Sequence, residues 1–168
     1  MNEHAQPAAA TRVRLRDFSR SLPMSLLRAR EAVMRHFRAS LRSHGVTEQQ
    51  WRVLRALSSV GEIEIADLVR STFLLAPSLS RILRDLEARG LIARRTPARD
   101  LRRSLISIAP SGVALMEEIA PQSEAIYAEI TARFGAERLA QLQDMLRDLE
   151  REMTAFGPGD AGDVGEEA

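Results

Sequence analysis

The sequence contains no cysteine among its 168 residues. This absence excludes a disulfide-stabilised scaffold, a zinc site with cysteine ligands and a sensor that works by thiol oxidation. Histidines are few, at positions 4, 36 and 44, and none pairs with a glutamate at zinc-site spacing on one helix face. A glycine-rich phosphate loop and a nucleophile elbow are both missing. These absences argue against an enzyme, and we expect no cofactor and no metal.

Long apolar runs are absent as well. The longest is far too short to span a membrane, and the N-terminus lacks the apolar core of a signal peptide. We therefore expect a cytoplasmic protein with no membrane partner. A chain of 168 residues suffices for one domain with a sizeable core, or for a small domain with an added oligomerisation region.

The formal net charge of +1 conceals an asymmetry along the chain. Residues 1–75 contain 12 arginines and 7 acids, and residues 76–105 contain 8 arginines and 3 acids, so each segment carries +5. Residues 106–168 contain 4 arginines and 13 acids, which gives a charge of −9. The short middle segment therefore has the highest density of positive charge, and it is the candidate for binding a polyanion.

Residues 76–90, within this basic block, have the pattern of an amphipathic helix. Pro77 suits the first turn, and Gly90 suits the left-handed residue that ends a helix. The apolar stripe consists of Leu79, Ile82, Leu83 and Leu86. The opposite side carries Ser78, Arg81, Arg84 and Asp85. Hydroxyl and guanidinium groups near the N-terminal end are typical of a helix that enters the DNA major groove, and the alternative is an ordinary surface helix.

Three helices are predicted before this segment. The first extends from a cap at Ser21 to about His44, and Gly45 ends it. Its apolar stripe is Leu22, Leu26, Ala29, Val33, Phe37 and Leu41. Thr47 and Gln50 fit a capping box, and they start a second helix that reaches about Val60. Its inward residues are Trp51, Leu54, Leu57 and Val60. Residues 64–72 form a short third helix, and with residues 76–90 they make a helix-turn-helix.

A basic hairpin follows the helix-turn-helix. Residues 91–96 and 103–108 alternate as strands do, and residues 97–102 form the turn between them. Ile63 can add a further short strand. Arg94 and Arg95 lie in the first strand, where a solvated face explains them. A hairpin in this place acts as a wing, whose tip reaches the neighbouring minor groove.

The two ends of the chain differ from this central region. Helices are predicted from Pro110 to Gly135, with Pro121 kinking or dividing the first, and from residue 136 to 156. The last helix has apolar residues at alternating spacings of three and four: Leu139, Leu142, Leu146, Leu149, Met153 and Phe156. This heptad seam requires a partner. Residues 1–21 are expected to be a flexible basic arm, and residues 157–168 a disordered acidic tail.

The order of elements and three sequence motifs resemble the MarR family of winged helix-turn-helix transcriptional regulators. The motifs are APSLSRILRDLEARGLIAR at 76–94, Arg99-Asp100-x-Arg102, and ISIAPSG at 106–112. Ala109 departs from the family, which usually has threonine there. The resemblance implies a mainly α fold with a small β wing. Residues 47–108 would form the DNA-binding domain, and residues 22–46 and 109–156 a helical dimerisation region.

The resemblance also implies double-stranded DNA and a second copy of the chain as partners. A two-fold dimer places two recognition helices about 34 Å apart, so the operator should be an inverted repeat. The candidate DNA contacts are Ser78, Ser80, Arg81 and Arg84, with Arg99 and Arg102 from the wing. Asp100 is expected to hold Arg102. An ion pair with Asp85 or Glu87 is the alternative role for Arg84.

A narrower resemblance is to regulators that repress homoprotocatechuate (3,4-dihydroxyphenylacetate) degradation operons. It rests on SLLRAREAVM at 25–34 and TEQQWRVLR at 47–55. It implies a repressor of an aromatic-acid catabolic operon that a phenolic acid releases. The candidate effector contacts are Ser25, Arg30, His36 and Trp51. Alternatives remain: His36 as a packed or surface histidine, Arg30 paired with an acid of the C-terminal half, and Trp51 as core. A regulator with another effector and a helical protein-interaction module are the alternative functions.

Overall fold

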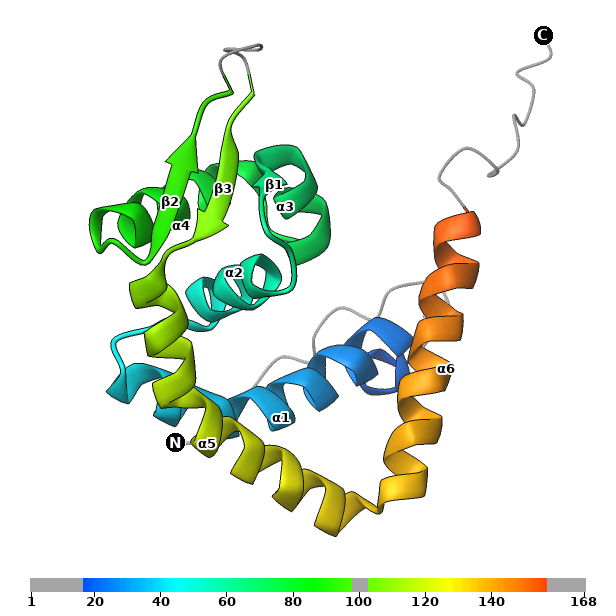
Figure 1. The fold of residues 1–168 in the computed structure, drawn as a ribbon. Coiled ribbons are helices and arrows are strands. Elements are labelled where there is room, and N and C mark those ends of the chain that lie inside the picture. Colours follow the sequence, from blue (N-terminus) through cyan, green and yellow to red (C-terminus); the bar gives the residue numbers. More distant parts are fainter. Residues whose placement is uncertain (1–16, 98–102, 157–168) are drawn as a thin grey trace, which may run out of the picture. The chain divides into compact units, whose positions relative to one another are not determined.

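The computed structural model of the protein describes residues 17–97 and 103–156 (Figure 1). Its helices are η1 (Phe18–Arg20), α1 (Leu22–Ser43), α2 (Glu48–Ser58), α3 (Ile65–Thr72), α4 (Ala76–Ala88), α5 (Pro110–Phe134) and α6 (Ala136–Ala155). Its strands are β1 (Ile63–Glu64), β2 (Ile92–Arg95) and β3 (Leu105–Ile108). The predicted fold class, mainly helical with a small β wing, is confirmed. The chain divides within α5 into two compact units, Met1–Leu115 and Met116–Ala168.

The strands form one antiparallel sheet in the order β1-β3-β2. The expected hairpin is the β2–β3 pair, in which Ile92 lies opposite Ile108. The short strand expected at Ile63 is also present, and it pairs with Ile106 on the other edge of β3. Ile106 lies in the central strand and is fully buried. The wing therefore has a base that is fixed on both sides, and the predicted turn at its tip lies largely outside the described residues.

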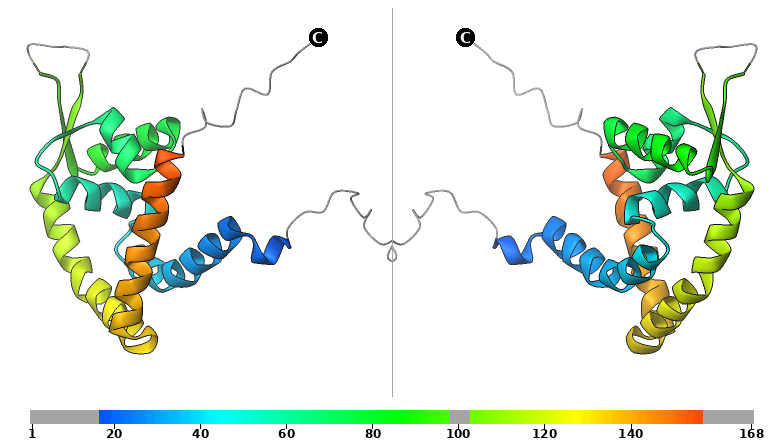
Figure 2. Two further views of the ribbon diagram at one scale, coloured as in Figure 1. Left: turned by 90° about the vertical axis from the view of Figure 1, so that its right-hand side faces the viewer. Right: turned by 90° about the vertical axis from the view of Figure 1, so that its left-hand side faces the viewer.

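Helices α2, α3 and α4 and the sheet, here called the reading head, surround one leucine-rich core (Figure 2). Its fully buried side chains are Val53, Leu54, Leu57, Leu68, Leu79, Leu83, Leu86 and Ile106. The inward position expected of Val60 is wrong, because α2 ends at Ser58 and the helical period no longer orients it. Val60 is 41% exposed, whereas Val53 of α2, which was not expected to face inward, is fully buried. Trp51 is half-buried.

The predicted helix boundaries depend on caps that the structure contains. The capping box of α2 is complete. The backbone N–H of Gln50 donates to the Thr47 hydroxyl at 3.2 Å, and the backbone N–H of Thr47 donates to the side-chain oxygen Oε1 of Gln50 at 2.8 Å. Gly90 follows α4 in the left-handed conformation with φ of 68°. A side chain there would be strained, so the glycine suits this position.

The expected flexible arm is corrected at its C-terminal end, because Phe18–Arg20 form a 3₁₀ turn. The Asp17 carboxylate accepts hydrogen bonds from the backbone N–H and the hydroxyl of Ser19, both at 2.7 Å. These bonds lower the pKa of Asp17, since they favour its charged form. Residues 1–16 of the predicted arm, and the predicted acidic tail at 157–168, lie outside the described residues.

The second unit consists of the rest of α5 and of α6. Pro121 was expected to kink or divide this helix, and the division is wrong, because α5 continues through it. A proline removes only one backbone hydrogen bond, and a helix of 25 residues retains the others on both sides. Helix α6 has no buried residue in this chain, and its predicted seam includes the exposed Leu142, Leu146, Met153 and Phe156. Within the described ranges, no helix combines the length and apolar character needed to cross a membrane.

The first turn of α5 packs against the start of β2 so closely that only glycine fits. A Cβ atom at Gly112 would lie 2.2 Å from the Leu91 carbonyl oxygen and 2.9 Å from Cγ1 of Ile108. We expect Gly112→Ala to lower the free energy of unfolding by about 1–3 kcal/mol, because backbone must shift. Urea unfolding at fixed protein concentration measures this change.

Gly61→Ala is the matched control, since a Cβ atom there meets nothing within 4 Å. Its unfolding free energy should stay within about 0.5 kcal/mol of the wild type. Equal stability of the two variants would contradict the packing argument.

Candidate functional site

Helix α4 presents a polar face because three leucines of its other face are buried, whereas Ile82 of the predicted apolar stripe is only half-buried. Leu79, Leu83 and Leu86 fill the core, and this fixes the rotation of the helix about its axis. Arg81 then lies directly opposite the buried stripe at the helical period of 3.6 residues. The four residues predicted to contact DNA from this helix are all exposed: Ser78, Ser80, Arg81 and Arg84.

The two arginines of this face have no ion pair within the described part of the chain. Arg84 donates from Nε to the Ser80 carbonyl oxygen of its own helix at 3.4 Å. The alternative pairing of Arg84 is not formed, because both acids have other partners. Asp85 accepts from Gln50 Nε2 at 2.6 Å, and Glu87 pairs with Arg94 at 3.2 Å. The guanidinium groups of α4 are therefore available to a ligand.

Arginines on the sheet and on α3, in contrast, are paired with acids. Arg95 donates to both carboxylate oxygens of Glu62, at 2.6 and 3.1 Å. This bidentate contact lowers the pKa of Glu62 and raises that of Arg95. Arg103 pairs with Glu64, and Arg70 with Asp67. The solvated positions expected of Arg94 and Arg95 are confirmed, since both are exposed. Arg99 and Arg102 of the wing, with Asp100, lie outside the described residues.

A hollow of about 350 Å³ lies between α3, α4 and β2. Its lining is Ile65, Ser80, Leu83, Arg84, Glu87 and Arg94. Two of these residues, Glu87 and Arg94, form an ion pair with each other. Ser80 and Arg84 therefore border both the outer face of α4 and this hollow.

The turn between α3 and α4 has an unusual backbone. Phe73 has φ of 52° and ψ of 32°, and it is the one non-glycine residue with positive φ in the described ranges. The preceding residue, Thr72, is fully buried, and its hydroxyl donates to the Leu68 carbonyl oxygen at 2.6 Å. Arg52 of α2 donates to the Thr72 carbonyl oxygen at 3.0 Å. The turn is thus fixed from two sides.

Arg52 also belongs to an ion-pair cluster at the junction of α1 and α2. The Glu48 carboxylate, only 11% exposed, pairs with Arg30, with Arg38 at 2.9 Å and with Arg52 at 3.2 Å. Glu31 adds a second carboxylate, which pairs with Arg30 and Arg38 at 2.8 Å. The cluster connects α1 to α2, and through Arg52 to the end of α3. Its three guanidinium groups face two carboxylates, which leaves one positive charge in excess.

The Glu31–Arg38 pair within this cluster has a defined pH dependence. The hydrogen bond from Arg38 lowers the pKa of Glu31 below its usual 4.5, and the pKa of Arg38 is raised. A depressed carboxylate pKa stabilises the folded state above the unfolded value. The contribution is therefore complete at neutral pH, and it is lost as the pH falls below about 4.5 and through the folded pKa.

The four candidate effector residues do not form one site. Ser25 and His36 are about three turns apart on one side of α1, whereas Arg30 lies roughly 140° around the helix from Ser25. The Ser25 hydroxyl donates to the Ser21 carbonyl oxygen at 3.1 Å, and His36 is exposed. Arg30 pairs with Glu31 and Glu48, which corrects the expected pairing with an acid of the C-terminal half. Trp51 follows Glu48 by one turn of α2.

The sequence-based interpretation missed Glu48. Glu48 is the first residue of α2, after the N-cap. An acid is common there because it interacts favourably with the helix dipole, so its sequence position gave no sign of an ion-pair cluster. The sequence does contain Arg30 and Arg38, eight positions apart on α1, which could have suggested a shared acidic partner. That partner, Glu48, lies in another helix. Only the packing of α1 on α2 brings the three side chains together.

These elements define a winged helix-turn-helix protein, in which α3 and α4 form the helix-turn-helix and β2–β3 the wing. Residues 44–103 match the model of the MarR family. The homoprotocatechuate degradative operon repressor of Escherichia coli is 40% identical over 129 residues, which cover 77% of this chain and 87% of the relative.

Solved structures agree with this assignment. The structure of the transcriptional regulator PA4135 has a TM-score of 0.75 and 40% identity, and covers 78% of this chain and 96% of that one. NadR in complex with 4-hydroxyphenylacetate has a TM-score of 0.71 and 35% identity, with coverage of 82% and 97%. The chain belongs to the MarR family. It is a transcriptional regulator and not an enzyme.

Removing the charge of Glu48 tests the cluster. We expect Glu48→Gln to lower the free energy of unfolding by about 1–3 kcal/mol, because three arginines lose a largely buried partner. Chemical denaturation at neutral pH measures the change.

Glu31→Gln provides the comparison, since the Glu31 side chain is 45% exposed and exposed pairs contribute little. It should destabilise the protein clearly less than Glu48→Gln. If Glu31→Gln lowered the free energy of unfolding more than Glu48→Gln does, Glu48 would not be the main stabilising carboxylate of the α1–α2 junction.

Proposed function

We propose that the protein is a homodimeric repressor of an aromatic-acid catabolic operon, released from an inverted-repeat operator by a phenolic acid such as homoprotocatechuate. The observation that carries the proposal is the 40% identity to the homoprotocatechuate repressor over most of both chains. The geometry of the reading head and of the α1–α2 junction supports its individual parts.

The outer face of α4 supports the DNA contacts. Neither Arg81 nor Arg84 has an ion pair among the described residues, and arginine binds guanine edges and phosphates in the major groove. Ser78 and Ser80 add small donors on either side of Arg81. Arg99 and Arg102 would add contacts from the wing to the adjacent minor groove. Arg81 and Arg84 give the outer face of α4 the positive charge that DNA binding requires.

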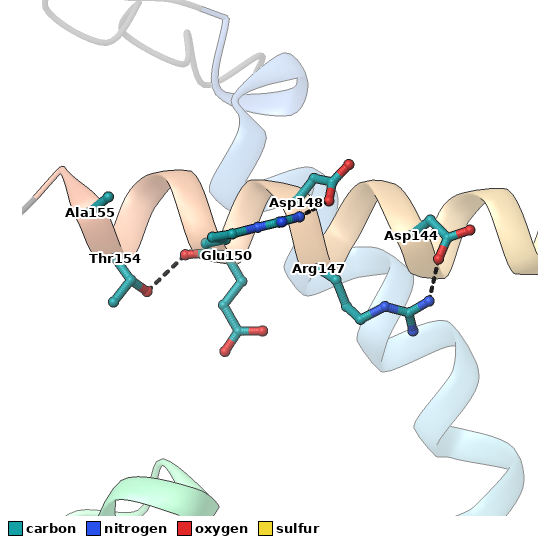
Figure 3. Close-up of a pocket in the computed structure, with 7 residues that line it drawn as sticks. Asp144, Arg147, Asp148, Glu150, Thr154 and Ala155 are labelled. Atoms are coloured by element: carbon teal, nitrogen blue, oxygen red, sulfur yellow. Dashed lines mark hydrogen bonds and ion pairs between the residues drawn. The ribbon is translucent and has the colours of Figure 1, made fainter.

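The exposed seam of α6 supports a dimer. Leucines repeated at heptad spacing need a second helix to remove them from water, and α6 buries none of them within the chain. The opposite face of α6 is charged: Figure 3 shows Arg147 directed towards Asp144 along the helix, and a second pair joins Arg151 to Asp148. Helix α1 also exposes Leu22, Leu26 and Leu27 at its N-terminal end. We propose that these surfaces pair between two copies.

The α1–α2 junction supports an acidic aromatic effector. The excess positive charge of the Glu48 cluster favours an added carboxylate near Arg30, and Trp51 offers an apolar wall. NadR was crystallised with 4-hydroxyphenylacetate, which combines a phenol ring with a carboxylate. An effector at this junction would act through Arg52 on the turn before α4. It shifts the protein between states only by its differential affinity for them.

Binding to the DNA upstream of the protein's own gene tests the proposal as a whole. We expect tight binding that weakens by about 10³-fold between about 50 and 200 mM salt, because several phosphates are contacted. Added 3,4-dihydroxyphenylacetate should release the protein, and fluorescence anisotropy measures both effects. If the compound leaves DNA binding unchanged, 3,4-dihydroxyphenylacetate is not the effector. If a randomised-site selection also yields no DNA that is bound more tightly than random DNA, sequence-specific repression is excluded.

Arg30→Ala tests the effector site separately. We expect it to raise the concentration of 3,4-dihydroxyphenylacetate needed for release by at least about tenfold, since a charged hydrogen bond to the carboxylate is lost. Operator affinity without effector should remain within about twofold of the wild type. Arg35→Ala, an exposed arginine on the same helix, is the control and should respond as the wild type does. An unchanged response of Arg30→Ala would exclude this site.

A further inference from the structure

The turn between α3 and α4 exposes two large apolar side chains. Phe73 is 81% exposed and Leu75 is 77% exposed, although both lie in the reading head, one and three residues beyond the end of α3. Leu75 is also the N-cap residue of α4, a position that usually holds a polar side chain. The N-terminal end of α4 therefore begins with an apolar surface, followed directly by Ser78, Ser80 and Arg81.

The backbone at Phe73 is strained for its residue type. A left-handed conformation is unfavourable for any residue with a Cβ atom, and for a bulky aromatic residue it is an outlier. Glycine or asparagine usually ends a helix in this way. Because the Phe73 side chain is also exposed, it gains little from packing within the chain, and backbone strain of this kind is found at sites that meet a ligand.

The turn is also rigid. The buried Thr72 anchors it to α3, and Arg52 binds the Thr72 carbonyl oxygen from α2. On the other side, the backbone of Leu75 accepts the first hydrogen bond of α4 from the Leu79 N–H at 2.9 Å. The direction of the Phe73 side chain from the backbone is consequently fixed before any ligand binds.

The position of Phe73 identifies what it meets. It lies in the turn three residues before the first residue of α4, whose polar face and N-terminal end supply the proposed DNA contacts. A phenylalanine side chain has no hydrogen-bonding group, so it discriminates only among apolar surfaces. On the base edges of the major groove, the apolar group is the 5-methyl of thymine.

We propose that Phe73 is a specificity-determining residue, which contacts the methyl group of a thymine in each operator half-site. The inference rests on the proposed binding of α4 in the major groove. It adds an apolar contact to a surface that otherwise offers only hydroxyl and guanidinium groups. The strain at Phe73 is then the consequence of holding an aromatic ring where a glycine would make an easier turn.

The test combines a change in the protein with the removal of a methyl group from the DNA. A randomised-site selection with the full-length wild-type chain first provides the operator. Each thymine of the half-site is then replaced by uracil, which removes only the 5-methyl group, and the affinity of each duplex is measured. The same duplexes are measured with Phe73→Gly and Phe73→Leu.

We expect one thymine at which uracil weakens wild-type binding by about fourfold, the effect of one buried methyl group. Phe73→Gly should bind the thymine operator at least about fourfold more weakly and should show no difference between thymine and uracil there. Phe73→Leu keeps an apolar side chain and should retain part of the difference. Val60→Ala, an exposed apolar residue elsewhere in the reading head, should behave as the wild type does.

Thermal unfolding separates this contact from a role in folding. Phe73→Gly relieves the backbone strain, so its Tm should be equal to or higher than that of the wild type. A lower Tm, unchanged operator affinity, or weaker binding with the thymine preference intact would each overturn the inference. Failure of the wild type to select any operator would instead overturn the proposed function.

Discussion

The Glu48 carboxylate is the group on which the connection between α1 and the reading head depends. It is almost completely withdrawn from water, and three arginines from two helices supply the positive charge that makes this burial tolerable. Removal of the Glu48 carboxylate would leave three guanidinium groups with only Glu31 to offset their charge. One of the three, Arg52, also holds the last carbonyl group of α3. Helix α1 is thus linked to the turn before the recognition helix through three consecutive polar contacts.

The chemistry of the recognition helix follows from which arginines have acids within reach. The arginines of α3, β2 and the start of β3 pair with the acids Asp67, Glu87, Glu62 and Glu64. On α4, Asp85 is held by Gln50 and Arg89, so Arg81 and Arg84 keep their charge without a partner among the described residues. Much of the positive charge of the basic segment is therefore paired with acids. The unpaired positive charge that can bind DNA lies on α4.

Local sequence signals were enough to predict most helices and strands. They were not enough to predict side-chain contacts between helices, because these depend on how the helices pack. Gly45, Gly90 and the Thr47 capping box mark boundaries that depend on neighbouring residues alone, so the helices and the wing were predictable. The Glu48 cluster depends on how α1 packs on α2, and no local pattern contains that information. The error at Val60 arose because a helical period was extended two residues past the end of α2. The strain at Phe73 was equally invisible, since nothing in the sequence shows its backbone angles.

The Gln50 side chain connects α2 to α4, and it does so as an uncharged group. Its amide accepts from Thr47 at the start of α2 and donates to Asp85 of α4 across 2.6 Å, so a neutral group holds the two helices together. A glutamate would complete the same capping box, but it would face Asp85 as a second carboxylate. One of the two acids would then have to take up a proton. With an amide in this place, α2 and α4 are joined without a second negative charge beside Asp85.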